Sequence, residues 1–245
     1  GKKSIRGVNF LNLKTGALDS LEAEEIIICS GTFESTKLLL ASSNQGWPDG
    51  IGNDSGHVGR HLMGHPVMFA SGIRPGNPDK LHQELGFRSL ISRHFDSPKY
   101  QPKGKMWFSG GVNSPSTLER QILSNVSRAD MNTKMISEMV ISLGGEMEQF
   151  EHTENRVSLG SGTTRFGLPT TKIEVGVHEI NLKTQREHVQ TFVKILKTAG
   201  CKEDSIETGF SNPDGAHASG TCRMSISDVD GVVDTNLQVH GTDNL

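Results

Sequence analysis

Cysteine is scarce in this sequence, and that scarcity excludes several classes of protein. The chain contains three cysteines, Cys29, Cys201 and Cys222, and no two of them form a CxxC pair. Three scattered thiols cannot build a disulfide framework, and without CxxC pairs there is no cysteine-based metal or redox motif. Cysteine usage therefore leaves the cellular compartment open.

Long apolar runs and an excess of charge of one sign are also missing. The longest apolar runs, such as Ile26 to Cys29, fall far short of the roughly 20 residues that a transmembrane helix needs. We therefore expect no transmembrane segment. The 25 basic and 28 acidic side chains give a formal net charge of −3. This near-neutral balance argues against nucleic acid as a partner.

The remaining composition is that of a globular protein. Hydrophobic residues make up 33% of the 245 residues, which is enough to build a core for one large domain or two modest ones.

After a turn at residues 241–244, Leu245 has the character of the first residue of a further strand. We therefore expect the chain to be a segment of a longer protein, truncated at both ends.

The first 45 residues predict a strand-turn-helix unit. Residues 25–29 are apolar at consecutive positions from Ile26 on, which predicts a strand buried on both faces. Ser30 and Gly31 follow, and a helix is expected over 35–42. Such units place backbone N–H groups near a phosphate or ribose in doubly wound folds. The alternative is a glycine that serves only packing, and this feature alone does not decide between the two.

The middle of the chain is predicted to be a strand-rich α+β region. The segments before and after it have the character of an α/β fold. We expect strands at 67–73, 136–143, 156–159 and 172–177, with a break at Gly144 and Gly145. Val189, Phe192, Val193 and Leu196 have helical spacing and predict a helix over 184–198.

No complete dinucleotide fingerprint is present. A GxGxxG motif must follow a strand and open a helix. Residues 50–55 carry Ser in place of the third glycine and follow Trp-Pro-Asp, and residues 160–165 end in Arg165. A phosphate loop, if the protein has one, is expected outside this segment.

His57, His61 and His65 are spaced at i, i+4 and i+8, and one or two helical turns are expected over 58–63. Histidines one turn apart can share a metal ion. The glycines and Pro66 around them disfavour a sustained helix, and His61 is not followed by Glu as in HExxH. We predict no metal site, and interpret these histidines as a hydrogen-bonded edge.

His217 lies among small residues that leave room for a ligand. A histidine can accept a proton from an alcohol near neutral pH, because its ordinary pKa is roughly 6.5. A structural role for a lone histidine is the alternative. Ser219 lacks the GxSxG context of a hydrolase nucleophile, and no partner supports Cys222 as a nucleophile.

Several ordered motifs together resemble the glucose-methanol-choline (GMC) oxidoreductase family. Near the C-terminus they are residues 217–224 (HASGTCRM), 231–234 (GVVD) and 239–245 (VHGTDNL). Upstream, residues 28–40 (ICSGTFESTKLLL) and 52–66 (GNDSGHVGRHLMGHP) are similar to the family's strand-glycine-helix segment and the stretch after it. Residues 155–159 and 165–169 resemble its substrate-domain segment. The likeness is thinnest between about 75 and 135.

The resemblance implies a flavoenzyme that oxidises an alcohol group by hydride transfer to flavin N5. FAD would lie in a Rossmann-like domain made of residues 1–65 and 211–245. An antiparallel-sheet substrate-binding domain, residues 66–210, would be inserted into it. His217 occupies the position of the family's base, and Ser30 and Gly31 match the strand-end pair near the adenosine half of FAD.

The wording of the motifs is most similar to the sugar and gluconate dehydrogenase branch, which implies a sugar, polyol or sugar acid as substrate. Electrons would pass to a cytochrome or a quinone, although oxidases that use oxygen share these motifs. The family's second catalytic His or Asn would lie past Leu245, so the segment alone is expected to bind FAD poorly and to be inactive. Two alternatives stay open at this point: a catalytically dead relative kept for binding or structure, and an NAD-dependent enzyme.

Overall fold

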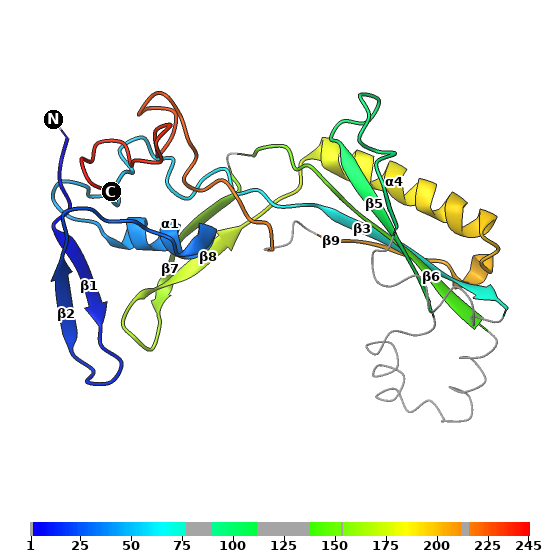
Figure 1. The fold of residues 1–245 in the computed structure, drawn as a ribbon, viewed down its shortest axis with the longest axis horizontal. Helices are drawn as coiled ribbons and strands as arrows, with labels where there is room; N and C mark the ends of the chain where they lie inside the picture. The colour runs from blue at the N-terminus through cyan, green and yellow to red at the C-terminus, as the bar shows by residue number, and fades with distance from the viewer. Residues whose placement is uncertain (1, 77–89, 112–137, 153, 212–215) are drawn as a thin grey trace. The chain divides into compact units, whose positions relative to one another are not determined.

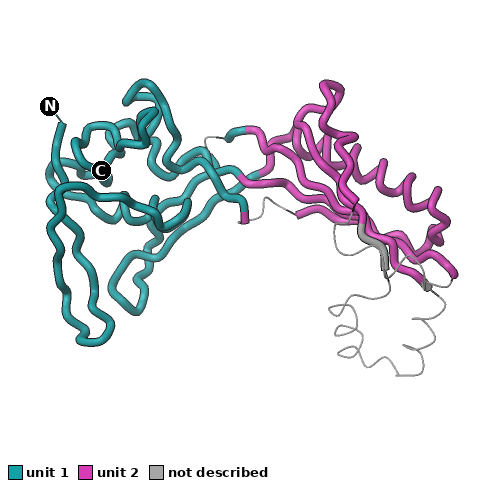
Figure 2. The backbone as a smooth tube through the Cα atoms, in the orientation of Figure 1, with its two compact units in different colours: residues 1–63, 151–176, 217–245 teal, residues 64–150, 177–216 magenta. Residues whose placement is uncertain are grey.

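The protein divides into two compact units, each assembled from separate stretches of the chain. The computed structural model describes residues 2–76, 90–111, 138–152, 154–211 and 216–245. Unit 1 comprises residues 1–63, 151–176 and 217–245, and unit 2 comprises 64–150 and 177–216 (Figure 2). Residues 151–176 thus return to unit 1 from inside the expected middle domain. The FAD-binding and substrate-binding roles of these regions stay a prediction.

Unit 2 contains an antiparallel sheet of five strands in the order β4-β5-β6-β3-β9 (Figure 1). The strands are β3 (Val67–Pro75), β4 (Leu90–Ser92), β5 (Gly104–Gly111), β6 (Glu138–Met147) and β9 (Glu207–Ser211). The central strand β3 pairs with β6 from Val67 to Pro75 and with β9 from Val67 to Ser71. The antiparallel sheet expected in the middle of the chain is therefore present.

Helix α4 (Glu179–Thr198) supplies the other half of the core of unit 2. Its apolar positions Val189, Phe192 and Leu196 recur every three or four residues, so they share one face and are buried. They pack with Met68 and Ile141 of the sheet. The helix expected from this spacing is confirmed. It begins earlier than expected because His178 caps it, accepting a hydrogen bond from Ile180 N at 3.2 Å. The 3₁₀ turn Glu203–Ser205 precedes β9.

The expected break at Gly144 and Gly145 is wrong, because both glycines lie inside β6. A Cβ at Gly144 would overlap the indole ring of Trp107 on β5, its partner in the strand register. A Cβ at Gly145 would lie 3.0 Å from Phe192 Cζ. These glycines therefore make room for one aromatic ring of β5 and one of α4, and they do not interrupt the strand.

Gly144→Ala is expected to destabilise the protein by about 1–3 kcal/mol, because the added methyl group must displace the Trp107 ring. Gly162→Ala is the matched control, since its Cβ would meet Thr170 at the ordinary distances of 3.4 and 3.5 Å. Urea unfolding monitored by tryptophan fluorescence compares the two variants. An equal effect of both substitutions would show that the ring imposes no constraint.

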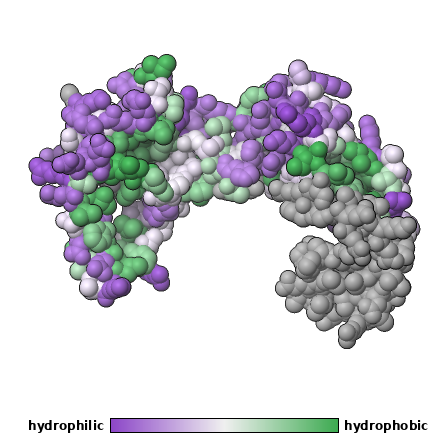
Figure 3. All heavy atoms as spheres, viewed as in Figure 1, coloured by the Kyte–Doolittle hydropathy of each residue, from purple (hydrophilic) through white to green (hydrophobic). Residues whose placement is uncertain are grey.

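Unit 1 consists of two hairpins, one helix and long irregular segments. Strands β1 (Gly7–Leu11) and β2 (Leu18–Glu22) pair from Gly7–Glu22 to Leu11–Leu18, and β7 (Arg156–Thr163) pairs with β8 (Pro169–Glu174). Helix α1 spans Gly31–Ala41. A small core surrounds it, made of Leu39, Trp47, Ile51, Val58 and Val232. Figure 3 shows apolar side chains that remain on the surface of this unit.

The buried strand expected at residues 25–29 is not formed. Ile27 is 84% exposed, and Ile26 and Ile28 are half-buried. In the described part of the chain this segment belongs to no sheet, and its backbone is held where Ile26 N donates to Asn244 O at 2.9 Å. An apolar run becomes a buried strand only where a neighbouring strand pairs with it.

None of the helices in the described residues combines the length and the apolar character needed to cross a membrane.

Candidate functional site

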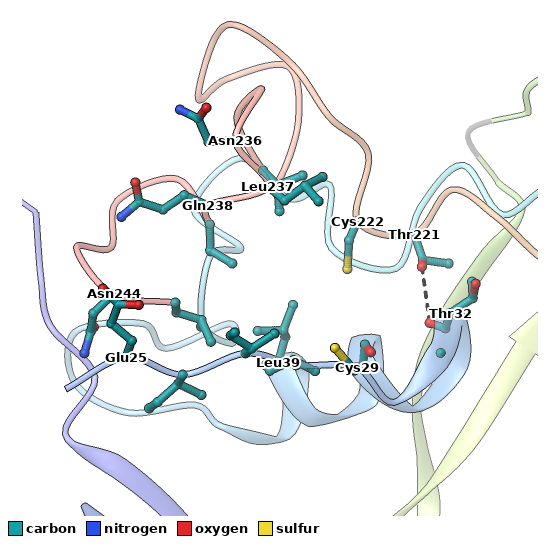
Figure 4. Close-up of a pocket in the computed structure, with 18 of the residues that line it drawn as sticks. Glu25, Cys29, Thr32, Leu39, Thr221, Cys222, Asn236, Leu237, Gln238 and Asn244 are labelled. Carbon is teal, nitrogen blue, oxygen red and sulfur yellow. Dashed lines mark hydrogen bonds between the residues drawn. The ribbon is translucent and has the colours of Figure 1, made fainter. Parts of the chain in front are cut away.

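A large cavity lies within unit 1, between the segment that leads into α1 and the C-terminal segment (Figure 4). Its volume is about 840 Å³, which falls in the range of small-molecule sites, roughly 300–1,000 Å³. Residues 25–29 and helix α1 form one wall. Residues 218–222, 236–239 and 243–245, together with Val233, contribute the others. Residues of four motif regions that the sequence analysis singled out, 28–40, 217–224, 231–234 and 239–245, thus line this cavity.

The lining of this cavity is mainly aliphatic, with acidic side chains and no basic ones. Ile26, Ile28, Leu39, Val239 and Leu245 supply apolar surface. The charged residues that line it are Glu25 and Asp243. Such a lining suits a flat or weakly polar group and does not neutralise an anion.

Helix α1 presents its N-terminus at this cavity. Ser30 is the N-cap residue and makes no capping bond through its side chain, so the first-turn N–H groups are left for other partners. Gly31 lines the cavity, has φ +77°, and has open space where a Cβ would project. That backbone conformation costs a side-chain-bearing residue about 1–2 kcal/mol. Glycine is therefore the favoured residue at this approach.

Two hydrogen bonds connect the start of α1 to the segment that follows His217. Thr32 Oγ1 donates to Ala218 O at 2.7 Å, and Thr221 Oγ1 donates to Thr32 O at 3.3 Å (Figure 4). Ala218 lines the cavity, and His217 precedes it with an exposed side chain. The structure therefore brings the predicted residues Gly31 and His217 to neighbouring positions of one unit, with Ser30 beside Gly31.

The two cysteines of unit 1 both line the cavity, and they differ in accessibility. Cys29 is exposed. Cys222 is half-buried, and burial raises the pKa of its thiol, while the nearby Thr36 hydroxyl opposes this. Its Sγ lies 3.8 Å from Thr36 Oγ1. A raised pKa disfavours the thiolate, so the structure gives no support to Cys222 as a nucleophile.

The expected helical turns over residues 58–63 are not formed, because this segment pairs with two others. Met63 N donates to Ser219 O at 3.0 Å and Ser219 N donates to Met63 O at 2.9 Å. On its other side Leu62 N donates to Asn155 O at 3.0 Å. These extended pairings replace the i to i+4 bonds of a helix. In the described residues no group of three or more metal-ligating side chains comes together.

Sequence reasoning missed a polar cluster around His61, which is 3% exposed. Its Nε2 lies 2.9 Å from His57 Nδ1 and 3.4 Å from Arg223 Nη1, and its Nδ1 lies against the carboxylate of Glu151. Arg223 Nη1 also donates to Glu151 Oε1 at 2.9 Å. The sequence offered two signals, the spacing of His57 and His61 and the place of Arg223 in the 217–224 motif, but nothing in it links either of them to Glu151.

Burial lowers the pKa of His61, and its neighbours act in both directions. The Glu151 carboxylate raises this pKa, and the positive charge of Arg223 and the ring of His57 lower it. The net lowering of the pKa favours the neutral form of His61. Its Nε2 then accepts hydrogen bonds from His57 and Arg223, which places the remaining ring proton on Nδ1, facing Glu151.

The residues of the cavity fit part of FAD, the cofactor that the resemblance implies. The aliphatic wall suits a ring system, the open space at Gly31 permits close approach to backbone, and the carboxylates of Glu25 and Asp243 can accept hydrogen bonds from ribose hydroxyls. A pyrophosphate needs cations or several N–H groups, and the lining offers no basic side chain. The fit therefore concerns the uncharged parts of the cofactor.

In the comparison with known proteins, residues 151–245 match the family model described as GMC oxidoreductase. The 6'''-hydroxyparomomycin C oxidase of Streptomyces lividus is 26% identical over 98% of this chain and 42% of its own length. The 2-methyl-1,2-propanediol dehydrogenase of Mycolicibacterium austroafricanum is 25% identical over 98% of the chain and 45% of its length. The fructose dehydrogenase large subunit of Gluconobacter japonicus is 25% identical over 91% and 41%. The chain thus spans less than half the length of these relatives.

Among solved structures, one of the formate oxidase of Aspergillus oryzae, determined to study the effect of a mutation on FAD modification, is similar in fold. It matches with a TM-score of 0.61 and 17% sequence identity, over 98% of this chain and 52% of that one. The mixed α/β fold with antiparallel sheets is therefore shared with part of this formate oxidase.

Proposed function

We propose that this chain, whose residues 151–245 match the family model of GMC oxidoreductase, is part of an enzyme that oxidises an alcohol group with FAD. The observation that carries the proposal is the shared cavity of unit 1. Its walls come from the α1 N-terminus with Gly31 and from the segment that begins directly after His217. Gly31, where a ligand can come close to the backbone, and the candidate base His217 thus lie in the same compact unit.

In this proposal His217 accepts the hydroxyl proton of the substrate. An imidazole nitrogen takes that proton as the C–H bond of the carbinol carbon breaks, so that the alcohol becomes a carbonyl compound. Bound FAD supplies the acceptor for the hydride, at N5 of its flavin ring. The exposed position of His217 gives its ring access to a substrate.

Ser30 and Gly31 are proposed to contact the cofactor through their backbone. Gly31, with open space at its Cα, lets a ligand approach closer than a side chain would allow. Unit 1 would then belong to the FAD-binding domain, and the sheet of unit 2 to the substrate-binding domain. The phosphate loop would be supplied from outside this chain.

The substrate we propose is a sugar, polyol or sugar acid. The relatives in the comparisons include a fructose dehydrogenase subunit and an oxidase of an aminoglycoside, which supports a polyhydroxylated substrate. A cytochrome or a quinone is the proposed electron acceptor.

Alkylation of Cys29 tests whether the cavity holds the cofactor, without depending on activity. Cys29 is exposed and lines the cavity. We expect FAD to slow its reaction with iodoacetamide by about tenfold in the whole protein, compared with the cofactor-free form, when labelling is resolved by mass spectrometry. The control is Cys201, which is buried in unit 2 and should react at the same low rate in both forms. Equal labelling of Cys29 with and without FAD would contradict the assignment.

A further inference from the structure

The segment 217–224 adopts a backbone that must be held in place from outside. Gly220 and Thr221 have φ of +90° and +46°, and His61, which lies against them, has φ of +60°. A Cβ at Gly220 would overlap His61 O. Non-glycine residues with such φ values are uncommon, and a β-branched residue such as Thr221 is an outlier there. Each costs of order 1–3 kcal/mol, which persists only where surrounding contacts over-determine the conformation.

The cluster around His61 supplies such contacts. Glu151 binds both His61 and Arg223, and Arg223 Nη1 also reaches His61 Nε2 at 3.4 Å. His57 supports the other side of the ring, with centroids 5.0 Å apart. Three stretches of unit 1 that are distant in sequence are thereby joined at one buried imidazole.

Arg223 links this cluster to the proposed base. It lies in the same motif as His217, and its carbonyl oxygen accepts from Val232 N at 2.9 Å. The intervening backbone is fixed at Ser219 by its pairing with Met63, and at Thr221 O by Gly59 N at 2.7 Å. The path of the chain after His217 therefore depends on contacts at both of its ends.

We propose that Glu151, Arg223 and His61 are positioning residues that hold the 217–224 segment, and with it His217, in the geometry that the reaction requires. This inference rests on the proposed function. It gives a role to His57 and His61, whose spacing resembles a metal site, because His61 contacts both His57 and Glu151. Because Nε2 of His61 must stay unprotonated to accept from His57 and Arg223, protonation of this ring would weaken the network.

Glu151→Gln tests the network by keeping the size of the side chain while removing its charge. We expect the rate of flavin reduction in the whole protein to fall by about 10- to 100-fold, because a displacement of about 1 Å can cost that much. The KM should change less than kcat. Glu154→Gln is the matched control, since Glu154 is exposed on the same segment; it should leave the rate unchanged. His61→Asn, which tolerates a left-handed backbone, should slow reduction similarly.

A second readout separates this proposal from the proposed function. In a histidine-labelled protein, NMR should show that the pKa of His61 falls in Glu151→Gln, because the carboxylate raises it, and rises in Arg223→Gln. The His61→Asn variant identifies the signal by its loss. If the wild-type protein reduces no flavin, the proposed function is contradicted. The contacts of His61 with Glu151 and Arg223 are then tested by this titration alone. A Glu151→Gln protein that matches Glu154→Gln in rate and in His61 titration would overturn the positioning role.

Discussion

Replacing His217 by alanine in the whole protein is expected to slow flavin reduction by alcohol about 10²- to 10⁴-fold, the range for losing a positioned general base. His217 directly precedes the cavity wall formed by Ala218 to Cys222. FAD binding should be unchanged, because the proposed contacts of the cofactor are made by Ser30 and Gly31. Stopped-flow absorbance under anaerobic conditions measures the rate.

His240→Ala serves as the control for this experiment. His240 is half-buried in the same unit, where its Nε2 lies 3.3 Å from Ser225 Oγ. Its loss should leave the rate of reduction within a few-fold of wild type. If His217→Ala reduces its flavin as fast as His240→Ala, the base must be another group.

The stability of unit 2 is expected to fall in acid because of a second histidine, His188. Its side chain is fully buried on α4, it stacks on Phe95 with ring centroids 3.6 Å apart, and neither ring nitrogen has a hydrogen-bond partner. Burial, with a smaller contribution from the charge of His94, lowers its pKa to about 4. The unfolded chain binds the proton more tightly, with a pKa of roughly 6.5.

Because the pKa of His188 is lower in the folded state than in the unfolded chain, the free energy of unfolding falls as the pH falls. Above pH 6.5 both states are neutral at this residue, and His188 adds no pH dependence. As the pH falls from 6.5 to 4 the unfolded state takes up the proton first, and the free energy of unfolding drops by a total of about 3 kcal/mol. Below about pH 4 the loss is complete. Thermal unfolding across this window measures it.

His188→Leu should remove most of this acid dependence, because leucine fills a similar volume and carries no proton. It should also be more stable than wild type at pH 5, since two unpaired polar atoms leave the core. His178→Asn is the control: it removes a half-buried histidine of the same unit and preserves an N-cap residue. An acid dependence that persists in His188→Leu would assign the effect to other groups.

The secondary-structure elements that could be predicted best are those in which the spacing of apolar residues within the element itself decides which face is buried. Val189, Phe192 and Leu196 form one helical face whatever the partner, so α4 could be predicted. Residues 25–29 have an equally clear apolar pattern, yet Ile27 is 84% exposed. For a strand, burial depends on a neighbouring strand that the segment itself does not specify.

In the candidate site, too, some residues could be predicted from local sequence, and others are brought together only by the fold. The motifs around Gly31 and His217 could be located from sequence, and the structure brings their neighbours Thr32 and Ala218 into hydrogen-bond contact. The cluster of His61, Glu151 and Arg223 could not be found, because only the return of residues 151–176 to unit 1 brings these side chains together. The histidine spacing suggested a helix edge, and competition from backbone pairing at Met63 removed the helix.

Anaerobic reduction of the whole protein by a panel of sugars, polyols, sugar acids and simple alcohols tests the central claim most directly. The account predicts that the protein binds FAD and that at least one polyhydroxylated alcohol bleaches the absorbance of the oxidised flavin. Bound flavin that no alcohol bleaches, or a protein that cannot be loaded with FAD, would contradict it.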